Sequence, residues 1–174
     1  MIQAPTPLNV LNEFSQEDFV QSLETLYEYS PWIVEKAYSF RPFLTVKSLQ
    51  AAFESIIYGS ESTKQIELLK AHPDLAAKLE QIESLTDFSQ AEQKRAGFAA
   101  LPQGKLEALQ TALAKYRSKF DHPFILCVSE HNATEVLPIL EMRSQSNLDA
   151  ERIACLAQVT RIGWHRLLQL VSEI

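Results

Sequence analysis

The residue of this chain best suited to proton chemistry is His72, in the run His72-Pro73-Asp74-Leu75-Ala76. An imidazole changes charge near neutral pH, so it can act as a general acid or base. Proline disfavours the α region for the residue before it, so we expect one helix to end at His72 and another to begin at Pro73. The two helix ends would shift the imidazole pKa in opposite directions. From these patterns alone, a histidine packed at a helix corner and bonded to a free carbonyl is the simpler interpretation.

A carboxylate follows in the run Ser89-Gln90-Ala91-Glu92-Gln93, just before Ala96-Gly97. Glu92 could orient an imidazole or accept a hydrogen bond from a ligand. It also has a purely structural explanation, because Ser89-x-x-Glu92 satisfies the capping-box pattern of a helix N-terminus. Both interpretations stay open at this point.

Other chemistries find little support in the sequence. The remaining histidines, His122, His131 and His165, have no metal-ligand spacing with one another or with the cysteines, so we expect no metal site. Cys127 and Cys155 show no Cys-x-x-Cys spacing, and two buried thiols are expected. The chain also lacks a Gly-x-Ser-x-Gly motif, a phosphate loop and a dinucleotide fingerprint.

Composition indicates one helical domain. The chain has 174 residues, 46% hydrophobic and 22% charged, which is ordinary for a globular protein, and no change of composition marks a boundary. Only four residues are glycine, whereas sheet-rich folds use glycine in hairpins and bulges. We therefore predict an all-α, single-domain bundle over residues 1–174.

Charge excludes several kinds of partner. The formal net charge of −6 disfavours a nucleic acid or an anionic membrane, which both require a basic surface. No Lys or Arg occurs before Lys36, so neither a signal peptide nor a transit peptide is indicated. The uncharged opening Met1 to Asn12 is too short and too rich in proline to span a bilayer. We expect a soluble, cytoplasmic protein without a membrane partner.

Capping residues and apolar periodicity predict about seven to nine helices. Ser15 is expected to cap the first of them and Asn147 the last, which continues to Val171 with Ile153, Leu156 and Leu167 on one face. The other expected helices begin at Pro31, at Thr45 or Ser48, at Ser62 with Gln65 completing a capping box, at Ser89, at Gly104, and at Asn132 or Thr134.

The run Pro123-Phe124-Ile125-Leu126-Cys127-Val128 is apolar, has no period and is too short for a typical helix. A lone strand could not satisfy its backbone, and the sequence offers no second strand of similar character. We expect a buried extended segment, or the start of a helix, whose backbone groups find partners elsewhere.

The order of these runs resembles one enzyme family. Members of the OHCU (2-oxo-4-hydroxy-4-carboxy-5-ureidoimidazoline) decarboxylase family carry His-Pro-Asp-Leu-Ala, then Leu-Thr-x-x-Ser-x-x-Glu-Gln-x-x-Ala-Gly, then Lys-Phe-x-x-Pro-Phe-Ile-x-Cys-Val, then a final Arg-Leu. This chain is similar at His72–Ala76, Leu85–Gly97, Lys119–Val128 and Arg166-Leu167. It departs from the pattern at Phe98, where leucine is commoner, and at Ser129-Glu130, where a basic residue is commoner.

The resemblance implies decarboxylation of a ureidoimidazoline to (S)-allantoin in urate degradation, by a homodimer without a cofactor. It implies His72 as acid/base, Glu92 as the partner of His72 or of the ureido group, and Arg166 as the residue that binds a substrate oxygen. Arg161, in the same helix, fits the pattern less well and has a surface charge as its simpler explanation. The resemblance also implies substrate-binding roles for Pro73, Ser89, Gln93, Phe124, Ile125, Leu126, Cys127 and Val128, the last five through their backbone.

The competing hypothesis is a non-catalytic helical module that binds a ligand or a partner. It predicts that His72, Glu92 and Arg166 lie apart on the surface, whereas an enzyme requires them to converge on one pocket.

Overall fold

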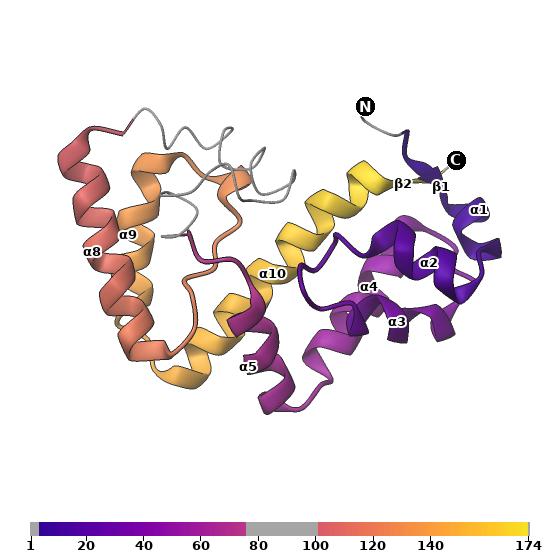
Figure 1. Cartoon of the computed structure of the whole chain (residues 1–174), viewed down its shortest axis with the longest axis horizontal. Coiled ribbons are helices and arrows are strands. Elements are labelled where there is room, and N and C mark those ends of the chain that lie inside the picture. The colour runs from indigo at the N-terminus through magenta and orange to yellow at the C-terminus, as the bar shows by residue number, and fades with distance from the viewer. Residues whose placement is uncertain (1–3, 76–100, 174) are drawn as a thin grey trace. The chain divides into compact units, whose positions relative to one another are not determined.

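The computed structural model of the protein describes residues 4–75 and 101–173 (Figure 1). Among them are eight α-helices and one pair of two-residue strands, which confirms the all-α prediction. Their contacts group into two compact units. We call residues up to 71 and from 159 onward the terminal unit, and residues 72–158 the central unit. The single-domain organisation stays a prediction.

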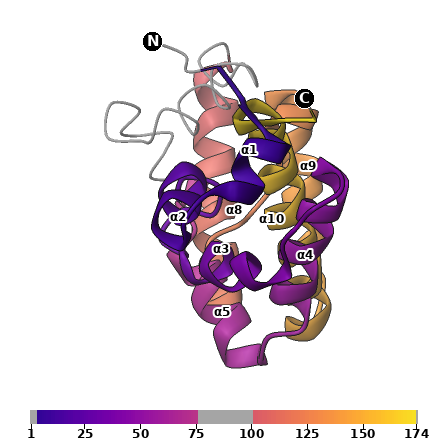
Figure 2. The ribbon, with the colours of Figure 1, turned by 90° about the vertical axis from the view of Figure 1, so that its right-hand side faces the viewer.

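The terminal unit contains the first helices of the chain, and α3 packs against both α2 and α4 (Figure 2). A short parallel pair of strands, which the sequence did not predict, joins Thr6 to Val171 and Pro7 to Ser172. The elements are β1 (Thr6–Pro7), α1 (Leu8–Glu13), α2 (Gln16–Leu23), α3 (Trp32–Ala37), the 3-10 turn η1 (Tyr38–Phe40), α4 (Val46–Tyr58), α5 (Ser62–Ala71), the end of α10 (Leu148–Leu170) and β2 (Val171–Ser172).

Two predicted caps of the terminal unit are confirmed. The Ser15 side chain accepts a hydrogen bond from the Asp18 backbone N–H at 3.1 Å, and Thr45 forms a capping box with Ser48. The capping box predicted at Ser62 is wrong, because Ser62 is already the first helical residue of α5. The amide of Gln65 donates instead to the carbonyls of Ile57 and Tyr58. These carbonyls lie in the last turn of α4, where no further helical N–H is available to them. They therefore accept from the Gln65 side chain in place of a capping-box contact.

The central unit contains α8 (Gln103–Phe120), the 3-10 turn η4 (Val128–Glu130), α9 (Ala133–Arg143) and the first part of α10. Asn132 and Glu135 form the capping box of α9, and Asn147 accepts from the Ala150 backbone N–H at 2.9 Å, as predicted for the last helix. Pro138 lies inside α9. It therefore removes one helical hydrogen bond without ending the helix.

The aperiodic run is a buried extended segment over residues 123–127, as predicted. Phe124 and Leu126 of this segment belong to the core of the central unit, where Tyr116 contacts Phe124 edge to face at 5.1 Å between ring centroids. This core consists of Leu75, Leu109, Leu113, Tyr116, Phe120, Phe124, Leu126, Val128, Ala133, Val136 and Leu140.

Helix α10 belongs to both units. Leu156 and Leu167 are buried, but Ile153, predicted on the same face, is 49% exposed. The reason is that Glu151 and Cys155 occupy the buried face of that turn. Within residues 4–75 and 101–173, no helix is long and apolar enough to cross a membrane.

Candidate functional site

His72 lies at the turn that follows α5, as the His-Pro step predicted, and its side chain is only 8% exposed. Two side chains that follow His72, one polar and one apolar, anchor this turn. Asp74 accepts a hydrogen bond from Arg117 of α8, with 2.5 Å between Oδ2 and Nη1, and Leu75 is buried in the core of the central unit. The imidazole is therefore attached to a fixed backbone, which a positioned acid or base requires.

The segment Phe124 to Val128 is held by two long polar side chains. Arg143 of α9 donates from Nη1 to the Ile125 carbonyl at 2.7 Å, and the Cys127 N–H donates to Oε1 of Gln158 in α10 at 2.9 Å. The prediction that this backbone finds partners elsewhere is confirmed. Both groups already have a partner inside the protein, and the role of this backbone in binding a substrate stays a prediction.

Beneath this segment lies a buried polar cluster of Tyr116, Arg143, Glu151 and Cys155. Glu151 accepts hydrogen bonds at Oε1 from the Tyr116 hydroxyl at 2.5 Å and from Arg143 Nε at 2.9 Å. Arg143 also donates to the Cys155 sulfur at 3.0 Å. Through Arg143, the cluster fixes the Ile125 carbonyl and with it the middle of the segment.

The charges of the cluster are confined to one ion pair. Burial raises the pKa of the Tyr116 phenol far above its usual value, and the neighbouring Cys155 and Glu151 raise it further. Burial also raises the pKa of the Cys155 thiol, against the opposing effect of Arg143. Burial lowers the pKa of Arg143, but the hydrogen bond to Glu151 together with the charges of Cys155, Glu151 and Tyr116 outweighs it, and the net shift is upward. Tyr116 and Cys155 therefore stay neutral around an Arg143–Glu151 pair.

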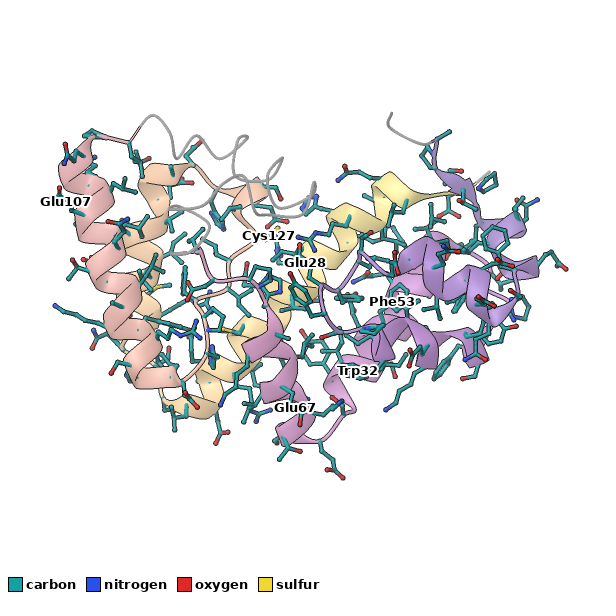
Figure 3. The ribbon with its side chains drawn as sticks, viewed as in Figure 1. Glu28, Trp32, Phe53, Glu67, Glu107 and Cys127 are labelled. Carbon is teal, nitrogen blue, oxygen red and sulfur yellow. The ribbon has the colours of Figure 1, made fainter. Side chains whose placement is uncertain are left out.

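Arg166 belongs to the terminal unit, where it is completely buried. Its Nη2 lies 2.9 Å from Oε1 of Glu28, and both side chains are at most 3% exposed. Figure 3 labels Glu28 beside α10. Arg161 lies on the exposed side of the same helix, as its simpler explanation predicted.

The predicted site residues thus belong to both units, and some lie outside the described residues. His72, Pro73 and the segment Phe124 to Val128, which includes Cys127 (Figure 3), lie in the central unit, and Leu75 links the His72 turn to the core that also takes up the segment. Arg166 lies in the terminal unit. Ser89, Glu92 and Gln93 lie outside the described residues.

Sequence reasoning missed Glu28, Arg143 and Glu151. Arg143 was detectable, since it follows the buried Val136 and Leu140 at helical spacing on α9 and so falls on the apolar face. Glu151 precedes the buried Cys155 by one helical turn in the same way. Glu28 lies in a turn without periodicity, and nothing in the sequence points to its ion pair.

Comparison with known proteins identifies the family. A family model described as OHCU decarboxylase matches residues 12–168. The 2-oxo-4-hydroxy-4-carboxy-5-ureidoimidazoline decarboxylase of Halalkalicoccus jeotgali is 36% identical over 160 residues, covering 92% of this chain and 89% of the relative.

Two solved structures agree with the fold. A crystal structure of (S)-allantoin synthase is 29% identical, with a TM-score of 0.71, over 95% of this chain and 54% of the other. An OHCU decarboxylase solved in the presence of (S)-allantoin has a TM-score of 0.67 at 20% identity, over 90% and 97%. At this low identity, the likeness to the second structure supports the fold alone. The family match across most of the chain and the 36% identical relative together show that this protein belongs to the OHCU decarboxylase family.

Proposed function

We propose that the protein is a carboxy-lyase that converts 2-oxo-4-hydroxy-4-carboxy-5-ureidoimidazoline to (S)-allantoin in urate degradation. The observation that carries this proposal is the family match over residues 12–168, which includes the His72-Pro73 turn. The decarboxylase relative, aligned over 92% of this chain, supports the same reaction.

The substrate itself accepts the electrons released by decarboxylation. Its carboxylate is attached to a ring carbon that bears a hydroxyl and lies beside an unsaturated carbon, so the electron pair left by CO2 enters the ring. An external electron sink is therefore unnecessary, and the protein has to supply placement and a proton. His72 would deliver the proton to one face of the ring, which sets the (S) configuration.

The remaining roles follow from side-chain chemistry. Arg166 would bind an anionic or carbonyl oxygen of the substrate, because a guanidinium offers several N–H donors in one plane. Glu92 would orient His72 or accept from the ureido group, with Ser89 and Gln93 as further partners. The backbone of Phe124 to Val128 would provide further hydrogen bonds, with the Ile125 carbonyl and the Cys127 N–H held in place by Arg143 and Gln158.

We also propose a homodimer, on the strength of the family resemblance. Light scattering coupled to size-exclusion chromatography should give twice the mass of one chain. A single-chain mass at the enzyme concentration used for turnover would contradict the dimer without affecting the proposed reaction.

The decisive experiment uses substrate generated freshly by oxidation of urate. Addition of the protein should produce optically active allantoin, followed by circular dichroism, faster than the spontaneous reaction, which gives a racemate. The alternative, a non-catalytic helical module, predicts that the rate and the optical signal stay those of the protein-free control.

A further inference from the structure

A buried ion pair joins α10 to the turn that follows α2. Nη2 of Arg166 lies 2.9 Å from Oε1 of Glu28. Nη1 of Arg166 points at the carbonyls of Thr25 and Leu26, at 3.5 and 3.4 Å. Three acceptors from one turn therefore surround the guanidinium. Such an arrangement restricts a long side chain to one orientation.

The backbone of residues 24–30, which we call the 24–30 turn, is folded so that Glu28 points inward. The Leu26 N–H bonds to the Leu23 carbonyl at 3.0 Å, and the Ser30 N–H bonds to the Tyr27 carbonyl at 2.9 Å. Tyr29 has a φ of 58°, in the left-handed region that disfavours side chains, and is 75% exposed. Strained backbone of this kind persists where the surrounding structure determines it, and it occurs often at functional sites.

Tyr27 docks the same turn onto α10 at Gly163. A Cβ at position 163 would lie only 2.6 Å from both Cε1 and the hydroxyl oxygen of Tyr27, so the ring lies directly against the helix backbone. The Tyr27 ring also contacts Phe53 of α4 edge to face, with 5.6 Å between the ring centroids. Positions 163 and 166 are neighbours on one helix face. The contact at Gly163 therefore places the next residue of the turn, Glu28, at Arg166.

We infer that Glu28 is a positioning residue for the reaction, which acts by fixing the guanidinium of Arg166. The inference rests on the proposed function, in which Arg166 binds a substrate oxygen. A group that stabilises a transition state must be held close to its productive geometry, and small displacements reduce the rate strongly. Glu28 would leave the chemistry to other residues and would set the direction in which the guanidinium presents its N–H groups.

Glu28→Gln tests the inference, since glutamine keeps the size of the side chain and a carbonyl acceptor but loses the charge. We expect kcat per folded enzyme to fall by about 10- to 100-fold, with KM changed less than kcat, because orientation is lost while Arg166 itself remains. The fraction of folded protein is measured by circular dichroism for each variant. Glu28→Asp keeps the charge on a shorter side chain and should recover part of kcat, and it serves as the test variant if Glu28→Gln does not fold.

Gln50→Leu is the matched control. The Gln50 amide donates to the Thr160 carbonyl at 3.1 Å, so it also ties a buried polar side chain of the terminal unit to α10. This variant should lose stability and keep a kcat per folded enzyme within about twofold of the wild type, as expected of a contact with a purely structural role.

A double-mutant cycle shows whether Glu28 acts through Arg166. If it does, Glu28→Gln should have almost no further effect on kcat once Arg166→Lys is present. Equal losses in both backgrounds would overturn the inference, and so would a normal kcat in Glu28→Gln while the wild type forms allantoin. A wild type that forms no (S)-allantoin would refute the proposed function, and the inference with it.

Discussion

At the scale of single residues, the proposed mechanism assigns the proton chemistry to His72. We expect His72→Asn to lower kcat by about 100-fold or more, because a positioned acid or base contributes roughly this much. Asparagine can occupy the same turn, and Asp74 and Leu75 still anchor the backbone, so the variant should fold. Turnover and far-UV circular dichroism measured on the same sample check both expectations. A folded variant with a near-normal rate would remove His72 from the mechanism.

The two arginines at the end of α10 give a second prediction. Arg166→Lys should raise KM, lower kcat, or both, since lysine keeps the charge but not the planar set of donors that Glu28 holds. Arg161 lies on the exposed side of the helix, so Arg161→Lys should be nearly silent. Steady-state kinetics per folded enzyme compare the two. Loss of activity in Arg161→Lys alone would transfer the substrate contact to Arg161.

At the scale of elements, Gly163 reverses a general rule. Gly→Ala inside a helix usually stabilises by about 0.5–1 kcal/mol. At position 163 the new methyl group would overlap the buried Tyr27 ring, and overpacking of this kind costs about 1–3 kcal/mol. We therefore expect Gly163→Ala to lower the free energy of unfolding, measured by urea titration.

Gly104, in α8, is the matched control for Gly163. Among the described residues, nothing lies within 4 Å of a Cβ built at Gly104. Gly104→Ala should accordingly be neutral or slightly stabilising. If Gly163→Ala behaved in the same way, the contact between Tyr27 and the α10 backbone would be looser than the structure shows.

The elements themselves were largely predictable from local chemistry. The caps at Ser15, Thr45, Asn132 and Asn147 were readable because each depends on residues within one turn of the chain. The box at Ser62 failed because a distant competitor, the end of α4, took the Gln65 amide. Local patterns cannot report such long-range competition.

The candidate site likewise combines features that the local sequence predicts with contacts that it does not predict. The break at His72 and the buried course of residues 123–127 follow from proline and from apolar content, which are local properties. The partners of the segment, Arg143 and Gln158, come from two different helices, and the Glu28–Arg166 pair joins distant parts of the chain. Only tertiary structure reveals these contacts, so the sequence could nominate Arg166 but not the residue that orients it.

At the scale of the whole molecule, we expect His122 to make the stability of the fold depend on pH. Burial lowers the pKa of His122, against its hydrogen bond with Pro123 and the charges of Glu151 and Asp121, while Arg143 reinforces the shift. As the pH falls below about 6.5, the unfolded chain binds a proton at this histidine more readily than the folded chain. The folded state should therefore lose stability from about pH 6.5 down to the lowered pKa of His122.

Urea unfolding between pH 7 and pH 5 measures this dependence. His122→Phe removes the titration and keeps an aromatic ring beside Tyr116 and Phe120, so its free energy of unfolding should fall less steeply with decreasing pH. Equal slopes for the variant and the wild type would show that other groups cause the dependence.

The composition of the terminal unit has a consequence for synthesis of the protein. This unit combines residues up to 71 with residues from 159 onward. The ribosome therefore completes its first part before the central unit and its second part after it. At roughly 5–20 residues per second, Arg166 is synthesised about 7 to 28 seconds after Glu28, its ion-pair partner. During this interval the nascent N-terminal helices must remain soluble, because the part of α10 that they contact has not yet been synthesised. The ion pair that orients Arg166 is thus among the last native contacts that a newly made chain can form.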